Sequence, residues 1–149
     1  MNDYLQTGLI VLATCMAIVV GWYYWKGYYP GSSYIVEEPP VTKNGLEEGQ
    51  AKFMFFYTTW CPYCTRAQKP WRDFKKQLKN SPMKYGNYTI LFEEIDAEKD
   101  KSKAALYKIT EYPVFKVETH KKVIEMKGVP DPLNFNQFLI SALGNKSST

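Results

Sequence analysis

Two cysteines separated by two residues, Cys61 and Cys64, are the side chains of this sequence with the clearest capacity for chemistry. The apolar and aromatic residues 53–57 precede them and predict a buried strand, and a segment with helical spacing follows. At this strand-to-helix junction Cys61 meets the first free backbone N–H groups of the helix, whose positive potential stabilises a thiolate. Pro62 suits the first helical position, because its missing N–H would have no partner there. Cys64 lies one turn further on, so Cys61 can attack a disulfide and Cys64 can resolve the product.

The elements that must position these cysteines form an alternating series. Apolar residues share one face of the helix that follows the pair: Ala67, Trp71, Phe74 and Leu78. Further along, the pattern predicts a strand at 88–95, a helix at 97–108, strands at 114–118 and 123–126, and a helix at 133–143. In the middle helix we expect Ala104, Leu106 and Tyr107 to point inward. This order predicts an α/β domain with two parallel strands joined by a helical crossover, extended by a hairpin and covered by helices.

The composition excludes several classes of protein. The chain has 149 residues, a net charge of +4 and three cysteines, which are too few for a disulfide-stapled fold. A structural zinc site needs four Cys or His ligands, and beyond the pair only Cys15 and His120 remain. The lysines are spread over expected helix and loop surfaces, which is typical of a solvated surface. We therefore expect no metal and no nucleic-acid partner.

A charge-free apolar run covers residues 4–25. At about 1.5 Å per residue it spans roughly 30 Å, the thickness of a bilayer core, and aromatic residues lie at both ends, as at a membrane interface. We predict a retained transmembrane helix that makes this a single-pass membrane protein. A cleaved signal peptide is the alternative, disfavoured because no Lys or Arg precedes the run and no small-residue cleavage pattern follows it. Ala13, Ala17 and Gly21 form a row that could contact another membrane helix, although small residues are common in such spans.

Residues 26–49 predict a linker, because glycine, proline and serine interrupt any long helix there. A short strand is expected near residues 34–36 or around Val41, and the folded domain is expected over residues 50–145. The orientation in the membrane stays open. Lys26 favours a cytoplasmic carboxyl-terminal part by the positive-inside tendency, whereas oxidative thiol chemistry would favour the opposite side.

The region 50–143 resembles the thioredoxin superfamily in several features at matching separations. These are Trp60 directly before the cysteine pair, Ile95-Asp96 at a strand end, Tyr112-Pro113 before a hairpin, Gly128 closing that hairpin, and a terminal amphipathic helix. The resemblance implies a three-layer sandwich in which a central mixed sheet carries helices on both faces. It also implies a cis peptide bond between Tyr112 and Pro113, beside the cysteine pair. The Tyr-Pro dipeptide resembles protein disulfide isomerase domains, and the Pro-Tyr between the cysteines resembles glutaredoxins.

This resemblance implies a membrane-anchored thiol–disulfide oxidoreductase, similar to protein disulfide isomerase, that acts on protein thiols and disulfides. Trp60 and Tyr63 would form an apolar rim for a substrate chain, and Tyr112 with Pro113 the facing wall. The redox-active disulfide of Cys61 and Cys64 would suffice without a further cofactor. Anchored thioredoxins of this kind occur in secretory, ER-type membranes and resemble proteins of large DNA virions, and the residues do not choose between these locations.

The sequence departs from the family pattern at three places. Phe55 occupies the position where thioredoxins usually have a buried acid that helps to move the proton of the resolving thiol. Our hypothesis is that Glu94, where the family often has lysine, supplies this carboxylate from the neighbouring strand; a surface glutamate is the alternative. Pro70 lies one residue further from Cys61 than usual, and the amino-terminal strand and helix of the family are shortened by the linker.

Two other functions stay open at this point. One is a tethered structural or partner-binding module with little turnover, which the missing acid permits and the intact cysteine pair disfavours. The other is an iron–sulfur glutaredoxin that bridges two chains through Cys61. The direction of electron transfer, the reduction potential, the substrate and the oligomeric state do not follow from the sequence.

Overall fold

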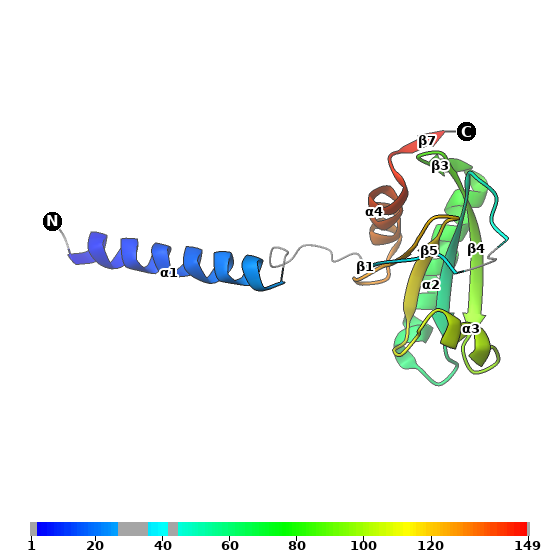
Figure 1. The fold of residues 1–149 in the computed structure, drawn as a ribbon, viewed down its shortest axis with the longest axis horizontal. Coiled ribbons are helices and arrows are strands. Elements are labelled where there is room, and N and C mark those ends of the chain that lie inside the picture. Colours follow the sequence, from blue (N-terminus) through cyan, green and yellow to red (C-terminus); the bar gives the residue numbers. More distant parts are fainter. Residues whose placement is uncertain (1–2, 27–35, 42–44, 149) are drawn as a thin grey trace. The chain divides into compact units, whose positions relative to one another are not determined.

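The computed structural model describes residues 3–26, 36–41 and 45–148, and the chain divides into two compact units, Met1–Tyr34 and Ile35–Thr149. The first unit contains a single described helix, α1 (Asp3–Lys26) (Figure 1). Across the described residues, no helix presents a stretch that is both long and apolar enough for a membrane crossing. The transmembrane span predicted for residues 4–25 is therefore not supported by the structure.

The second unit is built on one mixed sheet of seven strands in the order β1-β6-β5-β2-β4-β3-β7 (Figure 1). The strands are β1 (Val36–Glu38), β2 (Gln50–Tyr57), β3 (Met83–Tyr85), β4 (Tyr88–Asp96), β5 (Val114–Glu118), β6 (Val123–Glu125) and β7 (Lys146–Ser148). Strand β2 pairs in parallel with β4 and antiparallel with β5, and β5 forms the predicted hairpin with β6. The predicted crossover and hairpin are thus confirmed.

Alternate residues of β2 point to opposite faces of the sheet, and each face has its own apolar cluster. Phe53 and Phe55 pack on one face against α2 (Pro62–Asn80) and α4 (Pro132–Leu143). Met54 and Phe56 pack on the other face, where Tyr107 at the carboxyl-terminal cap of α3 (Lys101–Leu106) joins them. The prediction of an α/β fold with a mixed sheet covered by helices is therefore confirmed.

The helix predicted for residues 97–108 is shorter in the structure, because its start is set by a cap. The Asp100 carboxylate accepts the Lys103 N–H at 2.9 Å, so the helix begins at residue 101 and ends at Leu106. Ala104 and Tyr107 are buried as expected. The expectation for Leu106 was wrong, since its side chain is 57% exposed.

Three short strands in the outer parts of the sheet differ from the predicted pattern. The prediction missed β3 and β7, which pair with each other. Strand β1 pairs with β6 at the opposite edge and lies close to one of the two expected positions, although residues 34 and 35 fall outside the described residues. The β3–β4 turn requires glycine, because Gly86 has φ +57° and a Cβ there would lie 2.3 Å from the Leu143 carbonyl oxygen.

Candidate functional site

Cys61 sits at the amino-terminal cap of α2, where β2 ends and the helix begins. Its backbone is extended (φ −82°, ψ 115°), and Pro62 occupies the first turn, as the sequence predicts. The Cys61 sulfur accepts the Cys64 backbone N–H at 3.3 Å and lies 3.7 Å from the Tyr112 carbonyl oxygen, to which its thiol donates. A sulfur in the cap position takes the hydrogen bond that a serine or aspartate oxygen usually takes there, and the same N–H stabilises a thiolate.

Cys64 lies one turn further into the helix and is fully buried, whereas Cys61 retains 5% exposure. Both are free thiols. The pKa of the Cys64 thiol is raised from its ordinary value of 9.0 to about 11, first by burial and then by the hydrogen bond and charge of Cys61, while contacts with Thr58 oppose the rise. At neutral pH Cys64 is therefore a protonated thiol that must lose its proton before it can attack.

This burial predicts a pH-dependent stability of the reduced protein. Because the pKa of Cys64 is raised to about 11 in the folded state, the stabilisation is complete below pH 9, where the unfolded thiol is also protonated. It is lost as the pH rises through about 11, and amounts to roughly 3 kcal/mol. Denaturant titrations across this range should show a steeper loss in the wild type than in Cys64→Ala. Equal slopes in the two proteins would contradict the prediction.

The residues predicted to form the substrate surface surround Cys61. Trp60 and Tyr63 are exposed to 67% and 66%, large fractions for aromatic rings. The Trp60 and Tyr112 rings meet edge to face at 6.3 Å, and the Arg66 guanidinium lies 5.7 Å from the centre of the Tyr63 ring. The Tyr112-Pro113 bond is cis, as the resemblance implied. The structure therefore brings these side chains to one surface, and their contact with substrate stays a prediction.

Glu94 lies on the strand beside Phe55, as the sequence suggested. The two residues are register partners in the parallel pair, and both line a cavity of about 130 Å³ together with Trp71. Glu94 accepts the Trp71 Nε1–H at 2.9 Å and the Lys75 Nζ at 3.3 Å. The carboxylate thus occupies the side of the sheet on which α2 packs, while its described polar partners are Trp71 and Lys75 and not Cys64.

Sequence reasoning missed two threonines that precede Trp60, between the end of β2 and the cysteine pair. Thr58 is 3% exposed, and its hydroxyl has no hydrogen bond of normal geometry, although it lies close enough to Cys64 to lower the pKa of that thiol. Thr59 donates its hydroxyl to Glu98 at 2.7 Å and so ties the loop before Cys61 to the chain beyond β4. No spacing pattern in the sequence indicates these two threonines, because threonine is an ordinary residue at the end of a strand.

Within the described residues, no group of three or more His, Cys, Asp or Glu side chains could hold a metal ion. The cysteine pair is the candidate site because of its position at the helix cap and its hydrogen bonds. That the protein needs no further cofactor stays a prediction.

Comparison with known proteins matches the thioredoxin family model over residues 43–140. No curated protein sequence matches the chain. Among solved structures, human ERp44 is similar with a TM-score of 0.55 and 16% identity, covering 65% of this chain and 29% of that one. The J-Trx1 fragment of ERdj5 is similar with a TM-score of 0.53 and 17% identity, covering 66% of this chain and 44% of the fragment.

The first thioredoxin domain of mouse protein disulfide-isomerase A4 is similar with a TM-score of 0.50 and 17% identity, covering 62% of this chain and 60% of that one. The chain therefore spans less than two thirds of each of these three structures. At such identities the likeness concerns the fold. The family model, however, matches more than half of the chain, and the sheet, the capping Cys61 and the cis Tyr112-Pro113 bond agree with it. The chain belongs to the thioredoxin family.

Proposed function

We propose that this protein is a thiol–disulfide oxidoreductase that acts on protein disulfides. The observation that carries the proposal is the placement of Cys61 at the amino-terminal cap of α2. The Cys61 sulfur accepts a hydrogen bond from the Cys64 N–H, and the Cys64 side chain is fully buried. One sulfur accepts an N–H at the helix cap and keeps a small exposed fraction, and a second is fully buried within one helical turn. This is the arrangement that a two-step exchange requires.

The reaction proceeds through a mixed disulfide. The Cys61 thiolate attacks one sulfur of the substrate disulfide, a Cys61–substrate bond forms, and the other substrate sulfur leaves as a thiolate. Cys64 then loses its proton and attacks the Cys61 sulfur, which forms the Cys61–Cys64 disulfide and releases the second substrate thiol. The substrate gains two electrons and two protons, and the reverse sequence oxidises a dithiol. Trp60 and Tyr63 offer the exposed apolar surface on which a polypeptide substrate would lie.

Insulin reduction by dithiothreitol tests this function directly. The wild type is expected to accelerate precipitation of the insulin chains, and Cys61→Ser to lose the acceleration by roughly a thousandfold or more, because the nucleophile is gone. Cys15→Ser is the matched control, since Cys15 is an exposed cysteine of α1 outside the site. A wild type that is no faster than its Cys61→Ser variant would contradict the proposal and favour the partner-binding module.

We further propose that Glu94 assists the proton transfer from Cys64. The support is its position on the face of the sheet that α2 covers, beside Phe55, where thioredoxins have their buried acid. Glu94→Gln is expected to slow resolution of the mixed disulfide roughly tenfold without slowing its formation. Glu93→Gln, one residue away on the same strand, is the control. Resolution rates that are equal in Glu94→Gln and the wild type, measured by stopped flow, would end this proposal.

Membrane attachment is a separate proposal that does not depend on the cysteine chemistry. It rests on the charge-free run at residues 4–25 and on exposed apolar side chains of α1 such as Leu9, Leu12 and Ile18, while no described helix qualifies as a span. Extraction of membranes with alkaline carbonate is expected to leave the full chain in the pellet and a chain lacking residues 4–25 in the supernatant. Release of both chains would reject the anchor.

A further inference from the structure

One edge of the central sheet is left open at β4. Strand β4 is paired with β2 from Thr89 to Asp96. On its other side β3 pairs only through Lys84 with Thr89 and Tyr85 with Tyr88. In the part of the chain that the structure describes, no strand pairs with residues 90–96 on this side. An open strand of this length is a template for another extended chain.

The hydrogen bonds of β4 to β2 show which of its backbone N–H and C=O groups face the open side. The Thr89 N–H donates to the Gly49 carbonyl at 2.8 Å, and the Ala97 N–H donates to the Tyr57 carbonyl at 2.9 Å, so these residues face β2. Successive residues of a parallel strand direct their backbone groups to alternate sides. The N–H and C=O groups of Phe92 and Glu94 therefore point away from β2, toward the open side.

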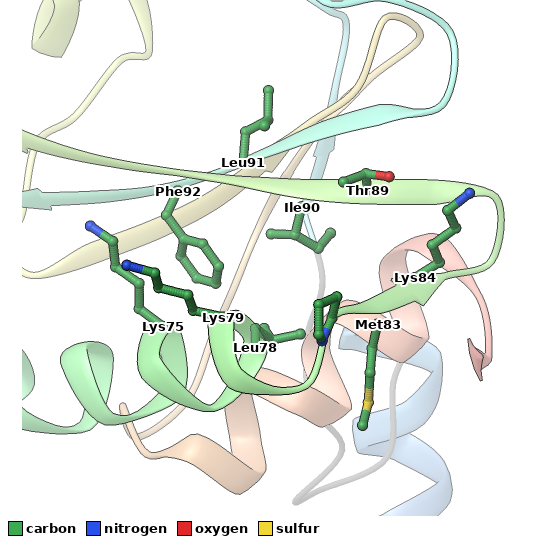
Figure 2. A pocket seen from close by; sticks show the side chains of 10 residues that line it. Lys75, Leu78, Lys79, Met83, Lys84, Thr89, Ile90, Leu91 and Phe92 are labelled. Carbon is green, nitrogen blue, oxygen red and sulfur yellow. The ribbon is translucent and has the colours of Figure 1, made fainter. Parts of the chain in front are cut away.

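A pocket of about 420 Å³ lies beside this open edge, between the carboxyl-terminal half of α2, the start of β3 and the first half of β4. Figure 2 shows Leu78 from α2 with Ile90 and Phe92 from β4 lining its interior. Its volume falls within the range of ligand pockets, roughly 300–1,000 Å³. The pocket can therefore take one large apolar side chain of an incoming segment.

Positive charge surrounds this pocket. Lys75 and Lys79 from α2 line it on the side of the sheet that α2 covers, whereas the side chain of Lys84 from β3, the register partner of Thr89, extends from the other face of the sheet (Figure 2). Lys75 is bonded to Glu94 at 3.3 Å, whereas Lys79 and Lys84 have no acidic partner among the described residues. An apolar depression with two uncompensated ammonium groups complements a segment that carries both an apolar and an acidic side chain.

We propose that this edge binds an extended acidic segment of a partner protein, which adds to the sheet as a strand beside β4. Side chains two positions apart share one face of a strand, so the segment would carry an apolar residue for the pocket and acidic residues two positions before or after it, on the face where Lys79 lies. Lys84, on the other face, adds positive potential at the same edge. About seven residues would span the open edge at roughly 3.3 Å per residue. The pocket lies at the carboxyl-terminal half of α2 and Cys61 at its amino-terminal end, so the apolar side chain of the segment would bind at the end of α2 remote from Cys61.

The proposal can be tested with a defined peptide, acetyl-TDVFVDT-amide, which places acidic residues two positions on either side of a phenylalanine. Titrated into the isotope-labelled full chain, it is expected to shift amide resonances of residues 90–94, and the double variant Lys79→Glu with Lys84→Glu to weaken binding roughly tenfold. The double variant Lys101→Glu with Lys121→Glu is the control, since it reverses two exposed lysines elsewhere. Equal weakening in both variants would contradict the proposal.

Two further peptides separate strand addition from other kinds of binding. TKVFVKT, with lysines in place of the acids, is expected to bind more weakly, and a form of TDVFVDT with alternate amides methylated is expected not to bind, because it lacks the N–H groups that pair with β4. Undiminished binding of the methylated peptide would overturn strand addition. Shifts of the same resonances with protein concentration alone, together with a dimeric mass, would overturn the proposal in favour of a second copy of this chain.

Discussion

A Cys64→Ser variant is expected to stay covalently attached to its substrate through Cys61. The first exchange needs only the Cys61 sulfur, and the backbone N–H of residue 64 would still donate to it. The second exchange needs the buried sulfur one turn away, which serine lacks. An attack held in position within one molecule is faster than attack by a dilute external thiol by several orders of magnitude. The mixed disulfide should therefore persist at least roughly a hundredfold longer than in the wild type.

The adduct can be measured on non-reducing gels and by intact mass after mixing the variant with a disulfide-linked peptide dimer. Both variants also carry Cys15→Ser, because Cys15 is an exposed thiol that could form an adduct of its own. Cys61→Ser is the matched control and should form no stable adduct, since its remaining thiol, Cys64, is buried and protonated at neutral pH. An adduct on Cys64 in that control, with none in Cys64→Ser, would mean that the two sulfurs exchange roles. The mechanism proposed above would then be wrong.

Phe53→Ala is expected to lower the free energy of unfolding by about 3 to 5 kcal/mol. Phe53 is fully buried at the centre of the larger apolar cluster. Six aromatic rings surround it with centroid separations of 4.9 to 6.3 Å: Trp71, Phe74, Phe92, Phe115, Phe135 and Phe138. Removing the central ring leaves a cavity that β2, α2 and α4 all line. Since domains of this size are stable by about 5 to 15 kcal/mol, a large share of the stability would be lost.

Denaturant unfolding of the variant beside the wild type measures this loss. Leu133→Ala, an exposed leucine at the start of α4, is the control and should change stability by less than about 0.5 kcal/mol. A loss below about 1 kcal/mol in Phe53→Ala would show that the surrounding rings close the cavity. In that case the cluster would be far more deformable than close-packed interiors are.

Those parts of the fold that follow from local patterns could be predicted from the sequence. The aromatic run before Cys61 and the helical spacing after it place β2 and α2 within a few residues. The cysteine spacing indicates the reactive pair, and the parallel order of two strands places Glu94 beside Phe55. Each of these inferences needs only periodicity, a cap or one strand pairing, all of which are encoded over short stretches of chain.

The features that the sequence did not reveal depend on contacts between distant segments. Strands β3 and β7 are each three residues long, and β7 forms only against β3, so no alternation of its own marks it. The glycine-asparagine pair at residues 86–87 is a hairpin signal that could have located β3. The open edge of β4 exists because β3 is short. The Thr58 hydroxyl is buried because of the packing around Cys64.

Trp60 is two-thirds exposed beside the reactive thiols, while Trp71 is buried against Phe53 and Phe55. The folded unit thus contains two indole fluorophores in opposite surroundings, one in water and one in an aromatic cluster. With Trp22 and Trp25 of α1 replaced by phenylalanine, emission from a Trp71→Phe protein would report the redox state of the cysteine pair, and emission from a Trp60→Phe protein would report unfolding. The chain therefore carries separate optical probes for its chemistry and for its stability, without any attached dye.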